Sequence, residues 1–165
     1  MKDRHAIPGE GGEPRFFADS MLGKLARWMR TIGFDVEYEK DIDDSRLVER
    51  AMEEGRIILT RDTLLIRRRV IRGRYIFIKS AFVGEQLREI SAVFPIGYEM
   101  FLSRCIRCNA LLEESSAEDV EDKVPAYVHD TQKKFMRCPL CRRVYWAGTH
   151  REKMLSDLSS LLGRG

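Results

Sequence analysis

The sequence has few of the features that mark membrane proteins, secreted proteins and strongly basic proteins. No apolar run approaches the roughly 20 residues that a membrane-spanning helix needs, so we expect no membrane-bound part. The first 14 residues contain no apolar stretch typical of a secretory signal, and we interpret them as the flexible tail of a cytoplasmic protein. The net charge is only +3, so any affinity for polyanions must come from local clusters of basic residues.

Motifs of several enzyme classes are also absent. The segment ADSMLGKLAR, at the end of the first predicted strand, has one glycine and lacks the GxGxxG loop of dinucleotide-binding proteins. The absence of a GxxxxGKS or GxxxxGKT loop excludes a P-loop nucleoside triphosphatase, and the absence of GxSxG argues against an α/β hydrolase. The three histidines lie outside residues 15–102, so catalysis by a nucleophile and an imidazole has little support there.

Residues 15–102 alternate short apolar runs with amphipathic patterns. These patterns predict strands at residues 16–18, 36–38, 57–60 and 75–78, and helices at residues 20–33, 43–55, 63–72 and 85–94. The first helix is expected to have an apolar face made of Met21, Leu22, Leu25, Ala26, Trp28, Met29 and Ile32. Apolar strands separated by helices are typical of a parallel sheet covered on both faces, so we predict an α/β fold.

The character of the sequence changes after residue 102. Two CxxC motifs, Cys105–Cys108 and Cys138–Cys141, enclose an acidic, turn-rich segment that can bury little. Further along, apolar side chains recur at helical spacing, namely Met154, Leu155, Leu158, Leu161 and Leu162. We predict a tail at residues 1–14, an α/β domain at 15–102, a cysteine module at 103–150 and an amphipathic helix at 151–165.

Acidic residues follow three of the predicted strands. Asp19 follows the first strand, Asp41 and Asp44 follow the second, and Asp62 follows the third. Because the carboxyl ends of parallel strands share one edge of a sheet, we expect these carboxylates to lie near one another. Mg²⁺ and Mn²⁺ prefer oxygen ligands and can promote phosphodiester cleavage. The pattern predicts a Mg²⁺ or Mn²⁺ site made of Asp19, Asp44 and Asp62, with Asp41 as a further catalytic acid.

Each of these acids also has a structural alternative. Asp43 or Asp44 can cap the helix that follows the second strand. Asp19 can complement the dipole of the first helix from its first turn. Asp62 can cap the segment that follows the third strand. The shared position at three strand ends favours the site over three unrelated caps.

Basic residues lie close to the acids in the sequence. Lys24 and Arg27 recur at helical spacing opposite the apolar face of the first helix, while Arg61, Arg67 and Arg68 surround the acid after the third strand. Clusters of this kind fit phosphate contacts, which provide affinity without sequence readout. We therefore predict that all five bind substrate, with a solvated surface as the alternative for each.

The four cysteines give the most specific signal in the chain. Two CxxC motifs supply four thiolates for tetrahedral Zn²⁺ and leave no open coordination position, so the predicted metal is structural. The ligands would be Cys105, Cys108, Cys138 and Cys141. His129 and His150 are alternative ligands, although four cysteines already complete the coordination shell.

Three segments resemble a known family. These are FFADSMLGKLARWMRTIGFD, the D-x-x-D pair formed by Asp41 and Asp44, and GRIILTRD. They resemble the PIN-like RNase domain found at the C-terminus of mut-seven-type exonucleases. Members of that family typically carry a zinc ribbon after the nuclease domain, which the CxxC pairs and the segment YWAGTH match here. The resemblance covers residues 15–153.

The resemblance implies a PIN-like three-layer α/β/α fold with a small C-terminal zinc ribbon, and metal-dependent cleavage of RNA. Acidic positions of the family motifs match Asp19, Asp41, Asp44 and Asp62, and flanking positions match Gly23, Arg27 and Arg61. One departure is that many PIN domains have a fourth acid beyond these three strands. Here no acid follows the fourth strand before Glu85.

These observations predict a metal-dependent ribonuclease whose partner is RNA, with a protein or the ribosome as a further expected partner. Basic clusters and a zinc ribbon also fit a non-catalytic RNA- or ribosome-binding module. A third alternative is that the chain acts by binding another protein, as in toxin–antitoxin pairs built on PIN domains. The sequence leaves the oligomeric state open.

Overall fold

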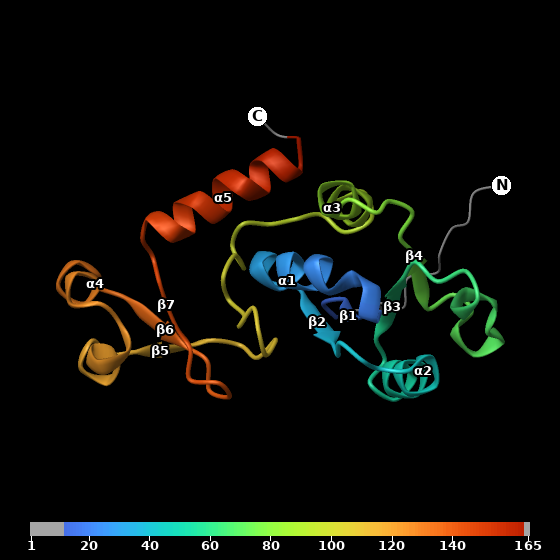
Figure 1. Ribbon diagram of the computed structural model, residues 1–165, viewed down its shortest axis with the longest axis horizontal. Helices are drawn as coiled ribbons and strands as arrows, with labels where there is room; N and C mark the ends of the chain where they lie inside the picture. The colour runs from blue at the N-terminus through green and yellow to red at the C-terminus, as the bar shows by residue number, and fades with distance from the viewer. Residues whose placement is uncertain (1–11, 164–165) are drawn as a thin grey trace.

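The computed structural model describes residues 12–163, except for the side chains of residues 149 and 150. Most of the predicted tail at residues 1–14 therefore lies outside the described residues. The described chain forms a parallel sheet with flanking helices, followed by a small antiparallel sheet and a last helix (Figure 1). Within residues 12–163, no helix has the length and apolar character needed to cross a lipid bilayer.

The central sheet has four parallel strands in the order β2-β1-β3-β4. The strands are β1 (Arg15–Ala18), β2 (Asp35–Tyr38), β3 (Ile57–Thr60) and β4 (Tyr75–Phe77). All four residues of β3 are buried, as expected for a strand with helices on both faces. This confirms the predicted α/β fold with a central parallel sheet.

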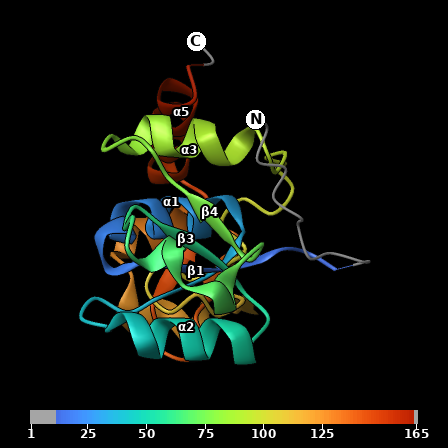
Figure 2. The same ribbon diagram turned by 90° about the vertical axis from the view of Figure 1, so that its right-hand side faces the viewer.

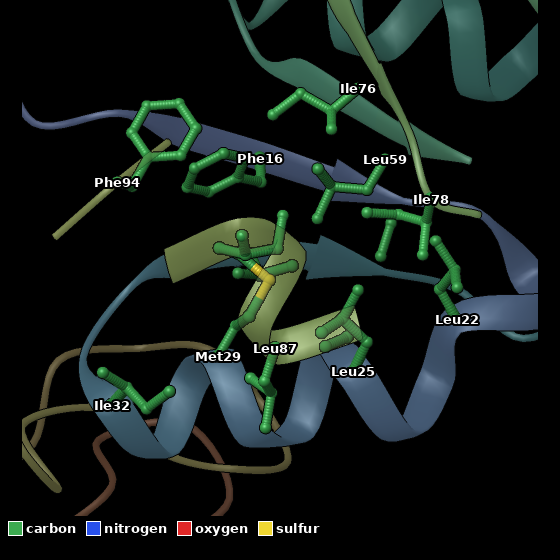
Figure 3. Packing of buried hydrophobic residues seen from close by; sticks show 14 of the residues in the cluster. Phe16, Leu22, Leu25, Met29, Ile32, Leu59, Ile76, Ile78, Leu87 and Phe94 are labelled. Carbon is green, nitrogen blue, oxygen red and sulfur yellow. The ribbon is translucent and has the colours of Figure 1, made fainter. Parts of the chain in front are cut away.

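Helices cover both faces of this sheet. Figure 2 shows α1 (Gly23–Ile32) and α3 (Val83–Ser91) on one side and α2 (Asp44–Glu53) on the other. On the first side, Phe16 and Leu59 of the sheet pack with Met29 of α1 and Leu87 of α3 (Figure 3). Burying one apolar stripe of each helix in this way supplies the main stabilisation of a layered domain.

Two local expectations are wrong. Residues 63–72 form two short 3₁₀ turns, Leu65–Arg67 and Arg69–Ile71, where one helix was predicted. Leu65 and Ile71 are both buried in the core that faces α2, although they would lie about 120° apart on a continuous α-helix. Arg68, which is extended (φ −69°, ψ 121°), separates the turns and lets both side chains point inward.

The second wrong expectation concerns Met21. It was assigned to the apolar face of the first helix, but it lies in a 3₁₀ turn (Ser20–Leu22) before α1 and is 60% exposed. The α-helix itself starts at Gly23 and ends at Ile32, and the next residue, Gly33, has a φ of 107° in the left-handed region. A Cβ atom at Gly33 would also approach Met100 to 2.5 Å, so only glycine fits there.

The cysteine module forms a three-stranded antiparallel sheet in the order β5-β6-β7. Its strands are β5 (Glu113–Ser115), β6 (Phe135–Arg137) and β7 (Val144–Trp146), with the short helix α4 (Ala126–Thr131) between β5 and β6. The last helix, α5 (Thr149–Leu161), runs from this module back to α3 (Figure 1). Leu158 and Leu162 join the core shared by the central sheet, α1 and α3.

Candidate functional site

Asp19 lies directly after β1, in the middle of the sheet edge. Its backbone N–H donates to the carbonyl of Leu59 (2.9 Å), which extends the pairing of β1 with β3 by one residue. Its side chain is 7% exposed and accepts hydrogen bonds from Ser20 Oγ (3.1 Å), the Met21 N–H (3.2 Å) and Thr60 Oγ1 (2.6 Å). This carboxylate caps the 3₁₀ turn Ser20–Leu22, whereas the first turn of α1 has no acidic residue, so the alternative of an acid in the first turn of that helix is wrong.

Asp62 is tied to Asp19 through Thr60, the last residue of β3. Thr60 is fully buried, and its hydroxyl donates to Asp19 while it accepts the backbone N–H of Asp62 at 2.9 Å. Oδ1 of Asp62 accepts the N–H of Leu64 at 2.7 Å and so closes the turn before Leu65–Arg67, a 3₁₀ turn that itself has no side-chain cap. Oδ2 of Asp62 makes no hydrogen bond within the described part of the chain, so it is available to a ligand.

The acids after β2 have different surroundings. Asp43 is the N-cap of α2, and its carboxylate accepts the N–H groups of Ser45 (3.0 Å) and Arg46 (3.1 Å). Asp44 therefore does not cap the helix; its Oδ2 lies 3.6 Å from a guanidinium nitrogen of Arg68. Asp41 is exposed and makes no side-chain hydrogen bond or ion pair with any described residue.

These carboxylates share one edge of the sheet but do not form a tight cluster. Among residues 12–163, only one group of at least three His, Cys, Asp or Glu side chains has all its ligand atoms within 4.8 Å, and it consists of the four cysteines. Parallel pairing of β1 with β2 and β3 places Asp19, Asp44 and Asp62 beyond neighbouring strand ends. A Mg²⁺ or Mn²⁺ site at these residues stays a prediction.

The predicted substrate-binding bases fall into two groups. Lys24 and Arg27 are exposed on α1 and line a hollow between that helix and the first CxxC segment. Arg61, Arg67 and Arg68 follow β3. Arg68 pairs with Asp44 and also donates to Ser45 Oγ at 3.2 Å, while the buried Nε of Arg61 makes no hydrogen bond within residues 12–163.

The first CxxC motif forms a tight backbone turn around its cysteines. The N–H of Cys105 donates to the carbonyl of Ala110 (2.8 Å), and the N–H of Asn109 donates to the carbonyl of Cys105 (2.9 Å). The N–H of Cys108 points at Sγ of Cys105 at 3.4 Å. Asn109 follows the second cysteine with a φ of 64°, in the left-handed region that asparagine tolerates better than most residues.

The second CxxC motif repeats this geometry. The N–H of Cys138 donates to the carbonyl of Arg143 (2.9 Å), the N–H of Arg142 donates to the carbonyl of Cys138 (3.0 Å), and the N–H of Cys141 points at Sγ of Cys138 (3.5 Å). Arg142 has a φ of 62°, matching Asn109. The two turns bring their four sulfur atoms within 4.8 Å of one another, an arrangement able to hold a metal ion.

The thiols have unequal affinities for protons. Burial alone would raise the pKa of Cys105, but hydrogen bonds from the Tyr145 hydroxyl and from backbone N–H groups outweigh it and lower the pKa to about 7. Burial, the neighbouring Cys141 thiol and the charge of Cys105 raise the pKa of Cys108 to about 12. Four thiolates this close repel one another, and a bound cation removes that repulsion.

A family model described as the Mut7-C RNAse domain matches residues 14–158, which is most of the chain. The chain belongs to this family. Comparison with curated proteins and with solved structures gives no match. Membership indicates a nuclease-type function with RNA as the substrate, and it confirms the family resemblance read from the motifs.

In this Mut7-C RNAse domain, the first CxxC turn is bonded to β2, an edge strand of the central sheet. The buried Asn109 side chain accepts the N–H of Val36 (3.0 Å) and donates to Asp35 (2.7 Å) and Glu37 (3.1 Å). Asp35 also pairs with Arg56 at 2.6 Å. This contact was not predicted, because nothing in the local sequence around Asn109 or Asp35 indicates it.

Two further contributions to the sheet edge were missed. Thr60 has the sequence pattern of an ordinary strand residue, and its place two residues before Asp62 was the only available signal. The expected gap after the fourth strand is partly filled by α3, since Glu89 accepts the N–H groups of Lys79 and Ser80, both at 2.9 Å. The Ser80 hydroxyl also donates to Glu85. Acidic side chains thus reach the end of β4 from a helix.

Proposed function

We propose that the chain is a metal-dependent ribonuclease that hydrolyses RNA phosphodiester bonds at the carboxyl edge of the central sheet. The main observation in support is the Asp19–Thr60–Asp62 arrangement. One buried hydroxyl bonds to Asp19 and to the backbone of Asp62, so the acids after β1 and β3 keep a fixed relation. Family membership supports a nuclease with RNA as its substrate.

The donor set at this edge suits a hard cation. Asp19, Asp44 and Asp62 would hold Mg²⁺ or Mn²⁺, with Asp41 as an additional acid, because all offer carboxylate oxygens and Oδ2 of Asp62 has no hydrogen-bond partner within residues 12–163. A divalent cation there supplies Lewis-acid activation of water and neutralises charge on the phosphate. Arg27 and Arg61 would hold the phosphate, a contact that suits the guanidinium group.

The four cysteines would hold Zn²⁺ in a structural site. Four sulfur ligands close the coordination shell, so this ion would have no position for substrate. The backbone N–H···S contacts at Cys105 and Cys138 suit thiolates, since they stabilise negative charge on sulfur. Elemental analysis of the carefully reduced protein should find one zinc per chain, and a value clearly below one would overturn this assignment.

The test of the nuclease is an Asp62→Asn variant compared with the wild type. The substitution keeps an oxygen acceptor for Leu64 but removes the charge that a cation needs. We expect loss of Mn²⁺-dependent cleavage of labelled single-stranded RNA with little change in the thermal melt. Asp122→Asn is the matched control, because Asp122 is exposed in the cysteine module. Equal cleavage by the wild type and Asp62→Asn would exclude the proposed edge as the active site.

A non-catalytic RNA-binding module is the second candidate. The exposed bases on α1 favour it, because they contribute to RNA affinity whether or not cleavage occurs. It predicts salt-dependent RNA binding that survives Asp62→Asn, with no cleavage product from the wild type at any Mn²⁺ or Mg²⁺ concentration.

A further inference from the structure

A basic hollow lies between α1 and the two cysteine turns. It has a volume of about 560 Å³, and its lining includes Lys24 and Arg27 of α1, Arg107 of the first turn and Arg143 beside the second. No acidic side chain lines it. We call it the basic groove and define it by these four residues. Neither the α/β domain nor the cysteine module forms it alone.

The four cations of the basic groove are available to a ligand. All four are exposed, and none forms an ion pair with a described acidic side chain. Arg30, which also lines the hollow, has a different role. It is buried, and its guanidinium donates to the carbonyls of Val36 (2.8 Å), Ile106 (3.1 Å) and Arg107 (2.9 Å). Arg30 therefore fixes the first turn against α1, so the groove has a defined shape before any ligand binds.

A smaller pocket of about 310 Å³ adjoins the basic groove. It shares Lys24, Arg27 and Ile106 with the groove, and its other lining residues are Trp28, Thr31, Met154 and Asp157. An indole beside aliphatic side chains suits the face of a nucleobase, which stacks on aromatic rings whatever its identity. Cations for phosphate thus lie next to a pocket that offers an indole for stacking, and the Asp157 carboxylate could accept a hydrogen bond from the base.

The basic groove also reaches the end of β1. Tyr38, the last residue of β2, lines the groove, and its hydroxyl donates to the carbonyl of Ser20 at 3.0 Å. Ser20 directly follows Asp19. Gly23 is required at this point, because a Cβ there would come within 2.8 Å of the Tyr38 hydroxyl oxygen. The groove therefore extends from the cysteine turns to the neighbourhood of the acidic edge.

We infer that the basic groove binds the backbone of single-stranded RNA, with one base in the adjoining pocket, and directs the strand toward the acidic edge. The inference rests on the proposed ribonuclease function and assigns its substrate path. A single strand fits better than a duplex, because only an unpaired base can leave its stack to occupy the pocket. The cysteine module then contributes directly to substrate binding.

The test measures binding separately from cleavage. Fluorescence anisotropy with a labelled oligouridylate is recorded in buffer without added Mg²⁺ or Mn²⁺, and without a chelator that would also remove zinc. The variant Arg107→Ala/Arg143→Ala should bind more weakly, and the slope of log K against log salt should fall by about 1.4, or about 0.7 for each cation. Arg107→Lys/Arg143→Lys keeps the charge and should restore most of the slope.

The matched control is Lys133→Ala/Lys134→Ala, which removes two exposed charges from another part of the cysteine module. It should leave the salt dependence of RNA binding near that of the wild type. If both double variants lose the same amount of slope, RNA affinity depends on the total charge of the protein, and the assignment of RNA binding to the basic groove is wrong. An abasic strand of equal length should bind about ten-fold more weakly, since base stacking is lost. Equal binding of both strands would remove the base pocket from the proposal.

The two proposals fail in distinguishable ways. If the wild type cleaves RNA and Arg107→Ala/Arg143→Ala binds RNA like the wild type, RNA binding by the basic groove is wrong and the ribonuclease proposal is supported. If Arg107→Ala/Arg143→Ala loses RNA binding but the wild type never yields a cleavage product, the ribonuclease proposal is wrong and RNA binding by the basic groove is supported. Preferential binding of polyglutamate over oligouridylate would assign the groove to an acidic protein partner and overturn its RNA assignment.

Discussion

The two predicted metal sites of this protein differ in how completely the chain builds them. The four cysteine sulfurs already lie within 4.8 Å of one another, whereas the acids of the sheet edge do not form such a group among residues 12–163. Each CxxC turn sets its own geometry through a few backbone hydrogen bonds. The acids are instead brought near one another by strand pairing, from residues that are 43 apart in the case of Asp19 and Asp62.

This difference fits two kinds of metal chemistry. A closed sulfur site favours a permanent ion that stabilises the fold. Separate carboxylates suit a cation that keeps several waters and takes a phosphate oxygen as a further ligand. If both metals bind as proposed, substrate would complete the coordination at the acidic edge, while the cysteine site would be complete without it. Four predictions test this comparison.

Removing the zinc site should have the largest effect. Cys138→Ser deletes a buried ligand and should release the metal, lowering the free energy of unfolding by several kcal/mol. The loss should extend beyond the module, because the first cysteine turn also bonds to β2. Urea unfolding followed by circular dichroism, with zinc measured in parallel, tests this. If Cys138→Ser contains no zinc but has the same free energy of unfolding as the wild type, the cysteine site does not stabilise the fold, and the proposed difference between the two metal sites is wrong.

Asn109 should show the next largest effect, because it joins the cysteine turn to the sheet. Asn109→Ala leaves the N–H of Val36 without its acceptor, and at a φ of 64° it replaces asparagine with a residue that tolerates the left-handed region less well. We expect a loss of about 2–4 kcal/mol, from an unsatisfied buried donor and backbone strain together. Asn109→Gly loses the same side-chain hydrogen bonds but adopts this φ without strain, so it should be about 1 kcal/mol more stable than Asn109→Ala. Equal stability of both variants would exclude the strain.

The same comparison explains which parts of the structure were predictable. The strands and the parallel sheet follow from apolar runs of residues such as those at 57–60, which burial on both faces requires. The cysteine site was predictable because its ligands come in two short repeats. Both patterns are local in sequence, so they can be read without knowledge of the tertiary structure.

The errors and omissions have a nonlocal origin. The segment 63–72 has helical spacing, but the need to bury both Leu65 and Ile71 breaks it into two turns. The ion pair of Arg68 with Asp44, which joins the segments after two different strands, was not predicted, and substrate binding by Arg68 stays a prediction. The link from Asn109 to Asp35 joins residues 74 apart, and nothing in the local sequence of either residue indicates it.

Thr60→Val should have a smaller effect on stability but a specific one on the acidic edge. Valine keeps the shape of the side chain and removes the hydroxyl that bonds to Asp19 and to the N–H of Asp62. We expect a loss of about 1–3 kcal/mol and a rise in the Mn²⁺ concentration that gives half-maximal cleavage, since the ligands are less well held. Thr60→Ser is the control and should behave like the wild type.

An unchanged Mn²⁺ dependence in Thr60→Val would contradict the role of Thr60 in positioning the acids. A parallel loss of zinc would contradict the separation of the two sites, because Thr60 contacts no residue of the cysteine turns through any hydrogen bond among residues 12–163.

The smallest effect is expected where the two regions meet, at Asp35. Burial acts to raise the pKa of this carboxyl, but hydrogen bonds from Arg56 and Asn109 and the charges of Arg56 and Arg104 outweigh it and lower the pKa. A carboxyl whose pKa is lower in the folded state stabilises the fold above its unfolded pKa of about 4, and this contribution is lost as the pH falls through the folded value.

Asp35→Asn should therefore be less stable than the wild type at neutral pH, and the difference should shrink as the pH falls below about 4. Urea unfolding at a series of pH values measures the difference, with Asp122→Asn as an exposed control that should follow the wild type throughout. A difference that grows toward acid pH would have the wrong sign for a stabilising carboxylate. Because Asp35 bonds to the first cysteine turn and to Arg56 of the sheet domain, the correct sign would show that charge helps to join the zinc module to the sheet.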